Sequence, residues 1–313
     1  MITFNTPIES DNGVCHIIEH SVLAGSEKYT TKEPFADLMK GSLQNFLNAM
    51  TGDDHTMYPI ASVNDKDYLN LMSVYLDGVF CPRVRKDPYA FYQEGHRWEI
   101  DEDGELIQNG IVYNEMRETE TSATTIIRRY VRNKLFNGTY QFECGGMPKT
   151  IESLTYEQFC KFYDDHYHPS NCITCLYSPM NLIEKEFELL HSYFKGKGQK
   201  ERYYPVVNEN NYFGKKDVVE FPIEDDEDDE KKDIFGYFWR LDHLNCQEKF
   251  TLELIRRLLV GVEGAPLDEK LKKLGICTKA TSYFNDEMEN CVLGIFARDA
   301  DPERFDEFIT VVE

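Results

Sequence analysis

The chain has 313 residues, of which 56 are acidic and 34 are basic, giving a formal net charge of −22. Such a surface repels nucleic-acid phosphates and anionic lipids, so neither a nucleic acid nor a membrane is expected as a partner. The length allows two ordinary domains, and no apolar run approaches the ~20 residues that a membrane-spanning helix needs.

The nine cysteines are odd in number and show no framework spacing. This pattern predicts a reducing compartment, the cytoplasm or an organelle matrix, and argues against secretion. Cys172 and Cys175 form one C-x-x-C within strand-forming residues. Positions i and i+3 of a strand face opposite sides, so this pair does not predict a metal knuckle.

Hydrophobic periodicity and turn residues predict alternating strands and helices along the first two thirds of the chain. Residues 1–8 are predicted to be extended, and the turn at 11–13 precedes a helix over 14–24 that stops at Gly25. Further helices are predicted over 35–47, 66–80, 115–135, 155–166 and 182–194, with strands at 57–63 and 173–177. This mixture predicts an α+β fold.

An acidic block at 224–233 cannot bury itself and predicts a solvated loop near the start of a second domain. The first clear strand of that domain is 234–241. We therefore expect a first domain over 1–205 and a second over 206–313. The helix that starts at Asp301-Pro302 is still amphipathic at residue 313, and the chain begins inside a strand pattern. We accordingly expect missing N-terminal strands and a truncated C-terminus.

A weak internal repeat suggests that the two domains are related. The segment from Cys172 and the segment from Cys291 both read as strand, turn and acidic amphipathic helix. A second local similarity aligns E-H-S-V-L-A-G, which starts at Glu19, with I-R-R-L-L-V-G, which starts at Ile255. This alignment sets Leu252, Ile255 and Arg256 opposite the polar positions 16, 19 and 20. A duplicated second domain would therefore have lost its metal site.

The sequence H-I-I-E-H places His16, Glu19 and His20 on one helix face, at i, i+3 and i+4. Two histidines one turn apart can direct ring nitrogens at one zinc ion, and the carboxylate between them can take a proton from water. A helix whose histidines only make local hydrogen bonds is the alternative. The motif predicts a zinc peptidase site.

A catalytic zinc site needs a third protein ligand, and spacing alone does not choose it. By residue type the candidates are Asp53, Asp54, His55, Glu94, His96, Glu115, Glu118 and His166.

Several short sequence segments follow one another along the chain in this order: G-V-C-H-I-I-E-H-S-V-L-A-G, K-E-P-F, N-A-M-T, Y-L-D-G-V-F-C-P, G-I-V-Y-N-E-M and Y-H-P-S-N. Together they strongly resemble the presequence protease branch of the pitrilysin-type zinc metallopeptidases. The resemblance is strongest over residues 1–180. It implies two tandem homologous domains, each with a mainly antiparallel mixed sheet packed with helices.

The same resemblance implies roles for individual residues. Glu115 of N-E-M would be the third ligand of one zinc ion, and Glu19 the general base. Asn48, Ala49 and Met50 would pair with extended peptide substrate. The function implied is hydrolysis of unstructured oligopeptides by an endopeptidase.

Relatives of this kind also contain a second, homologous half that helps to hold the peptide, and no such half is present in this sequence. We therefore expect a C-terminal half as a partner, without which the enzyme would be incomplete. Two alternatives stay open. One is a non-catalytic, peptide-recognising or structural half of such an assembly, and the other is an acidic binding protein with an accidental motif.

Overall fold

The computed structural model describes residues 1–208, 213–222 and 233–313. It divides into two compact units, residues 1–221 and 222–313, which are described separately. The predicted acidic loop at 224–233 lies outside the described residues except for Asp233. In the described parts of the chain, no helix is long and apolar enough to cross a membrane.

The first unit contains a four-stranded antiparallel sheet with the strand order β3-β4-β1-β9. Its strands are β1 (Ile2–Asn5), β3 (Met50–Thr51), β4 (His55–Tyr58) and β9 (Cys172–Thr174). Phe4 of β1 lies opposite Thr56 on one side and Cys172 on the other. In this order β3 is an edge strand, joined to β4 through the pairs Met50–Met57 and Thr51–Thr56.

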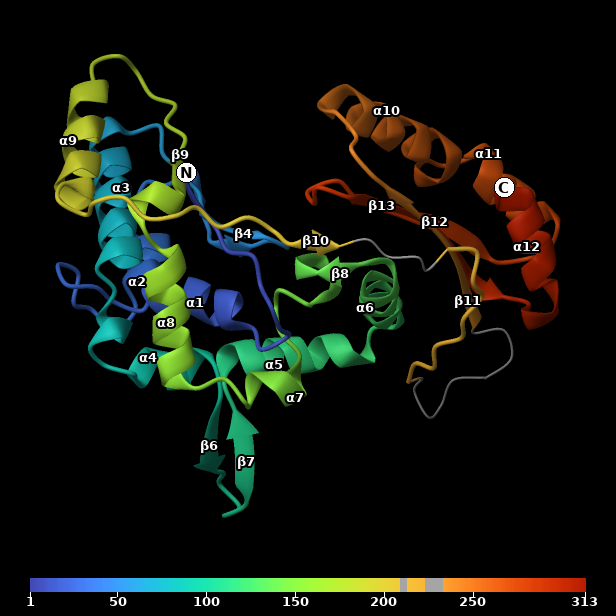
Figure 1. The fold of residues 1–313 in the computed structure, drawn as a ribbon, viewed down its shortest axis with the longest axis horizontal. Coiled ribbons are helices and arrows are strands. Elements are labelled where there is room, and N and C mark those ends of the chain that lie inside the picture. Colours follow the sequence, from blue (N-terminus) through green and yellow to red (C-terminus); the bar gives the residue numbers. More distant parts are fainter. Residues whose placement is uncertain (209–212, 223–232) are drawn as a thin grey trace. The chain divides into compact units, whose positions relative to one another are not determined.

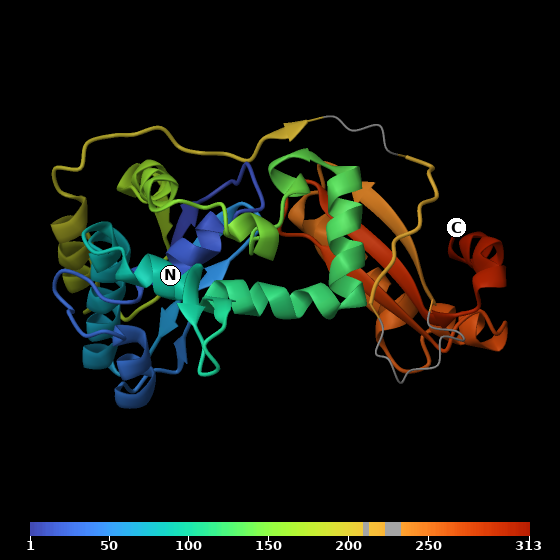
Figure 2. The same cartoon turned by 90° about the horizontal axis from the view of Figure 1, so that it is seen from below.

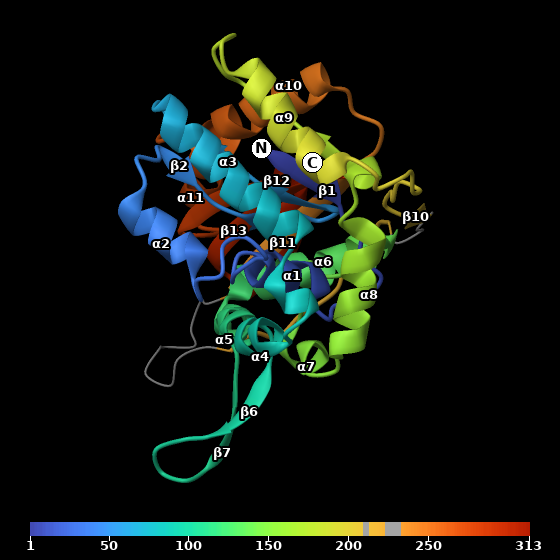
Figure 3. The ribbon, with the colours of Figure 1, turned by 90° about the vertical axis from the view of Figure 1, so that its left-hand side faces the viewer.

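Helices lie around this sheet and contain more of the first unit than its strands do. They are α1 (Val14–Val22), α2 (Pro34–Gly41), α3 (Asp65–Phe80), α4 (Tyr89–Glu94), α5 (Ile111–Glu118), α6 (Ala123–Leu135), α7 (Pro148–Ile151), α8 (Tyr156–His166) and α9 (Ile183–Phe194). Three two-stranded pairs complete the unit: β2 (Phe46–Leu47) with β5 (Ile60–Ala61), β6 (Arg97–Ile100) with β7 (Leu106–Asn109), and β8 (Asn137–Gly138) with β10 (Val207–Asn208). The β6–β7 hairpin projects away from the rest of the unit (Figures 1 and 3).

The core of this unit forms between the sheet and the buried faces of α1, α3 and α8. Phe4 is completely buried there. Its ring stacks on Tyr167 with centroids 4.4 Å apart and meets Phe80 edge-on at 5.6 Å. Apolar burial of this kind is the main term that stabilises a domain. The sheet and the helices around it therefore hold one another in place.

Replacing Phe4 with Ala is expected to lower the free energy of unfolding of the first unit by ~3–5 kcal/mol, because it leaves a cavity where no solvent reaches. Urea denaturation followed by circular dichroism measures this change. Ile173→Ala, at a neighbouring position that is 60% exposed, is the control and should change little. Equal effects of the two substitutions would contradict the description of this core.

Two predicted helices are shorter than expected. The helix predicted over 35–47 ends at Gly41, where the Ser42 hydroxyl donates to the Leu38 carbonyl, and the chain then becomes extended in β2. The helix predicted over 115–135 is two helices, α5 and α6, which run in different directions (Figure 2). Ser122 caps the second by accepting from the Thr125 amide, because its side chain competes with the helical backbone.

The second unit contains a three-stranded antiparallel sheet with the order β11-β13-β12. Its elements are β11 (Asp233–Leu241), α10 (Cys246–Arg256), a π-helical turn at Arg257–Gly261, α11 (Pro266–Lys273), β12 (Lys279–Asn285), β13 (Cys291–Ala300) and α12 (Phe305–Val312). Its core includes Phe235, Leu271, Ile295 and Phe308. Both units thus combine antiparallel sheets with helices, and the predicted α+β class is confirmed.

Candidate metal centre

Helix α1 supplies three polar side chains of the candidate site. It begins after Gly13, whose φ of +68° suits glycine, and it buries Val14, Ile17 and Ile18 in the core. The spacing of its residues leaves His16 and His20 one turn apart on another face, with ring centroids separated by 4.9 Å.

Glu115 of α5 lies beside these two rings. Its Oε2 is 3.6 Å from His16 Nε2 and 4.0 Å from His20 Nε2. The ligand atoms of the three residues all lie within 4.8 Å of one another, and no other such group of His, Cys, Asp or Glu is found among the described residues. The structure therefore brings His16, His20 and Glu115 together.

The second ring nitrogen of each histidine is held by a separate acceptor. His16 Nδ1 is 3.3 Å from the Gly145 carbonyl oxygen, and His20 Nδ1 is 3.2 Å from Glu94 Oε2. With Nδ1 protonated, both Nε2 atoms are acceptors directed at the Glu115 carboxylate. Two imidazole nitrogens and one carboxylate oxygen, with the outer nitrogens anchored in this way, fit a catalytic zinc ion.

Glu94 and Glu115 reach the site from opposite ends of the β6–β7 hairpin. Glu94 ends α4, just before the hairpin, and Glu115 lies on the helix that follows it. The two ends of the hairpin approach closely at Gly95 and Gly110. This approach requires glycine at position 110, because a Cβ there would overlap the carbonyl oxygen of Gly95. The hairpin therefore leaves the two carboxylates close to the same histidine.

The environment of His20 acts on its pKa in two directions. Burial disfavours the charged imidazole, but the hydrogen bond to Glu94 and the charges of Glu19, Glu94 and Glu115 favour it more strongly. The pKa of His20 therefore lies above its ordinary value. This direction reflects a concentration of carboxylates around one imidazole, which suits the binding of a cation.

Glu19 is only 8% exposed, although its side chain ends in a carboxyl group. Its Oε2 accepts a hydrogen bond of 2.7 Å from the Thr51 hydroxyl of edge strand β3. This bond fixes the carboxylate between the histidine-bearing helix and the strand. Glu19 does not belong to the group of ligand atoms around Glu115.

The other acidic candidates for a third ligand are engaged elsewhere. Asp53 forms a buried ion pair with Arg132. Asp54 accepts hydrogen bonds from His55 and from Tyr140.

The remaining candidates do not join the cluster either. His96 packs against Trp98 and Tyr113, and His166 is held by the Phe162 carbonyl. Glu118, on the same helix as Glu115, is not part of the group of ligand atoms. Glu94, a ligand candidate by residue type, instead contacts His20 on the nitrogen that faces away from Glu115.

The predicted substrate-binding residues lie at the start of the edge strand. Met50 opens β3, and Asn48 and Ala49 precede it. The backbone carbonyl of Asn48 accepts a hydrogen bond from the Tyr75 hydroxyl at 3.2 Å, and its backbone N–H donates to the Pro59 carbonyl. Met50 is 37% exposed. The strand to which the resemblance gives a role in peptide binding therefore lies next to Glu19, at an edge of the sheet.

The chain resembles known peptidases in sequence and in structure. The family model described as the peptidase M16 inactive domain matches residues 153–313, a range that begins after all the site residues. The sequence is 37% identical to Protein HypA of Clostridium perfringens over 99% of this chain and 32% of that protein. It is 34% identical to presequence protease 1, chloroplastic/mitochondrial, of Arabidopsis thaliana over 94% of this chain and 28% of that protein.

The crystal structure of pitrilysin matches 99% of this chain and 32% of its own, with a TM-score of 0.66 and 17% sequence identity. The chain thus spans about a third of the length of the curated relatives that it matches. The sequence and structural similarities agree with the resemblance inferred from the ordered motifs. The chain belongs to the M16 family of pitrilysin-type peptidases and is similar to its presequence proteases.

Proposed function

We propose that this chain forms the zinc-binding part of an endopeptidase that hydrolyses unstructured oligopeptides. His16, His20 and Glu115 would hold one zinc ion. The observation that carries the proposal is the approach of both Nε2 atoms to one Glu115 oxygen, at 3.6 Å and 4.0 Å. A zinc ion bound there supplies Lewis acidity toward water and a peptide carbonyl.

Glu19 is proposed to be the general base. Its carboxylate lies on the same helix as the two histidines and is held by Thr51. In this role Glu19 accepts a proton from the attacking water and later delivers it to the leaving amine. No covalent intermediate with the protein is required.

Peptide is proposed to bind as an additional strand along the edge of β3 opposite to β4, near Asn48, Ala49 and Met50. Backbone hydrogen bonds would provide the affinity, and they depend little on side-chain identity. A folded protein presents few unpaired backbone groups, so the preferred substrates would be unstructured.

We further propose that the second unit is a homologous domain without a metal site. The local sequence similarity aligns Arg256 with His20. Arg256 forms an ion pair with Glu253 at 2.7 Å and donates a hydrogen bond to the Ser282 hydroxyl. A C-terminal homologous half is the proposed partner. All nine cysteines are free, which supports a reducing compartment such as the cytoplasm or an organelle matrix.

The alternative function is a non-catalytic half that recognises peptides for an active partner. The intact set of His16, Glu19, His20 and Glu115 favours catalysis, because a purely recognising half has no use for both a ligand cluster and a base.

Chelation separates the two functions. The zinc-loaded chain is incubated with an unstructured peptide, and the products are identified by mass spectrometry. We expect slow cleavage that stops when zinc is removed by a chelator and returns when zinc is added back. Cleavage that resists chelation would contradict the zinc mechanism, whereas peptide binding without any products, even with a homologous second half supplied, would support the non-catalytic alternative.

A further inference from the structure

Arg132 is a buried cation on α6 that joins two separate segments of the first unit. Its Nη1 lies 2.7 Å from Asp53 Oδ1, in an ion pair that is almost inaccessible to solvent. Its Nε donates to the Tyr140 carbonyl at 3.2 Å, and its Nη2 donates to the Phe142 carbonyl at 2.8 Å. The planar guanidinium suits such a role because it presents several donors in a fixed fork.

Each segment joined by Arg132 continues into the candidate site. Asp53 follows Thr51 and Gly52, and the Thr51 hydroxyl holds the Glu19 carboxylate. The Phe142 carbonyl lies three residues before Gly145, whose own carbonyl contacts His16 Nδ1. Arg132 therefore connects the strand that holds the base with the loop that anchors a histidine.

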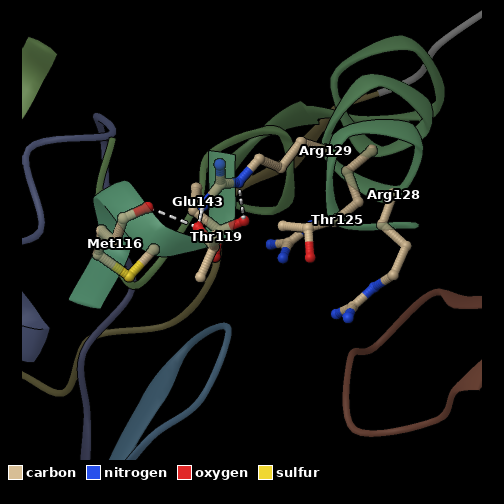
Figure 4. A pocket seen from close by; sticks show the side chains of 7 residues that line it. Met116, Thr119, Thr125, Arg128, Arg129 and Glu143 are labelled. Atoms are coloured by element: carbon tan, nitrogen blue, oxygen red, sulfur yellow. Dashed lines mark hydrogen bonds and ion pairs between the residues drawn. The ribbon is translucent and has the colours of Figure 1, made fainter. Parts of the chain in front are cut away.

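A neighbouring contact strengthens the same loop. Arg129 donates to the Glu143 carboxylate at 3.0 Å and to the Thr119 hydroxyl at 2.8 Å, which in turn donates to the Met116 carbonyl at 2.6 Å (Figure 4). A Cβ added at Gly145 would meet the Met116 side chain. The loop is thus packed against α5 directly beside Glu115.

We propose that Arg132 is a positioning residue, which sets the edge of β3 relative to the histidines through its ion pair with Asp53. The inference rests on the proposed function and adds a determinant of peptide binding that does not touch the metal or the peptide. Arg132 is buried and pairs with Asp53, so substituting either residue should displace the strand on which the peptide docks. His16, His20 and Glu115 lie on α1 and α5, outside both segments that Arg132 joins, so these variants are expected to keep their zinc.

Peptide affinity tests this role. A fluorescein-labelled unstructured peptide of Ala, Gln, Lys and Phe is titrated against the zinc-loaded chain carrying Glu19→Gln, which prevents turnover, and binding is read by anisotropy. Arg132→Lys keeps the charge but loses the fork, and Asp53→Asn removes the partner charge with little change in shape. Each is expected to weaken peptide binding on the order of tenfold, the size of one charged hydrogen bond.

The double variant tests whether Arg132 and Asp53 act as one unit, and the zinc content separates positioning from a general loss of structure. If Arg132 and Asp53 act as one unit, the double variant binds peptide no more weakly than either single variant. Zinc content is expected to remain about one per chain. Arg85→Lys is the matched control. It alters an ion pair outside the site, in which Arg85 Nη2 donates to both carboxylate oxygens of Asp164, and it should leave peptide affinity unchanged. If the Arg132→Lys variant does not fold, the peptide affinity of the Asp53→Asn variant alone tests the inference.

Unchanged peptide affinity in the single variants, or additive losses in the double variant, would overturn the inference. A starting chain that binds neither zinc nor peptide would instead refute the proposed function. The two failures are therefore distinguishable in the same set of samples.

Discussion

Glu19→Gln is expected to reduce peptide hydrolysis by about 10²–10⁴-fold while zinc stays bound, since general base catalysis commonly contributes that much. Glutamine keeps the size of the side chain and can still accept the Thr51 hydrogen bond, but it cannot take up the proton. Turnover of a fluorogenic unstructured peptide and metal content are measured on the same preparation, with the second half supplied.

Glu157→Gln is a suitable control for this substitution, because Glu157 is exposed in the first turn of α8 and outside the site. It should leave the rate unchanged. Loss of zinc from the Glu19 variant would make Glu19 a ligand and would contradict its assignment as the base.

Supplying a homologous second half is expected to raise the hydrolysis rate of this chain on the order of a hundredfold. The proposed ligands and base all lie between residues 16 and 115, so zinc affinity requires only the first unit. Catalysis also requires the peptide to be held in line with the attacking water, and a misplacement of ~1 Å can cost about that factor. The remaining portion of the Clostridium perfringens relative is a practical source, given 37% identity over this chain.

The rate is measured with zinc-loaded chain at increasing concentrations of the added half, and serum albumin at equal concentration serves as the control. A rate that saturates with the added half, and not with albumin, supports the proposed partner. Full activity of the isolated, monodisperse chain would contradict it.

The local pattern of the sequence predicted those features that depend on one segment at a time. The helix predicted over 14–24 from its apolar spacing is α1, which ends at Val22, and the strand predicted over 234–241 is β11. Helix spacing also placed His16 and His20 on one face, because i and i+4 side chains always lie one above the other. The choice of Glu115 came from the resemblance, since spacing alone could not choose among eight candidates.

Features that depend on contacts between distant segments were not predictable in this way. The contact of Glu94 with His20 joins residues that are 74 positions apart in the sequence. Asp53 and Arg132, which form an ion pair, are also far apart in the sequence. The break between α5 and α6 was missed because the amphipathic pattern continues on both sides of it. The break itself consists of Thr119, Glu120, Thr121 and Ser122.

Zinc content tests the central claim most directly. The purified chain is dialysed against buffer with trace zinc, and bound metal is quantified by inductively coupled plasma mass spectrometry beside the variants His16→Ala, His20→Ala and His191→Ala. His191 is an exposed histidine near the end of α9 and serves as the control. We predict about one zinc per chain in the unsubstituted protein and in His191→Ala, and loss of zinc from both site variants. Absence of zinc from the unsubstituted chain, or its retention in His16→Ala and His20→Ala, would contradict the assignment of a zinc peptidase site.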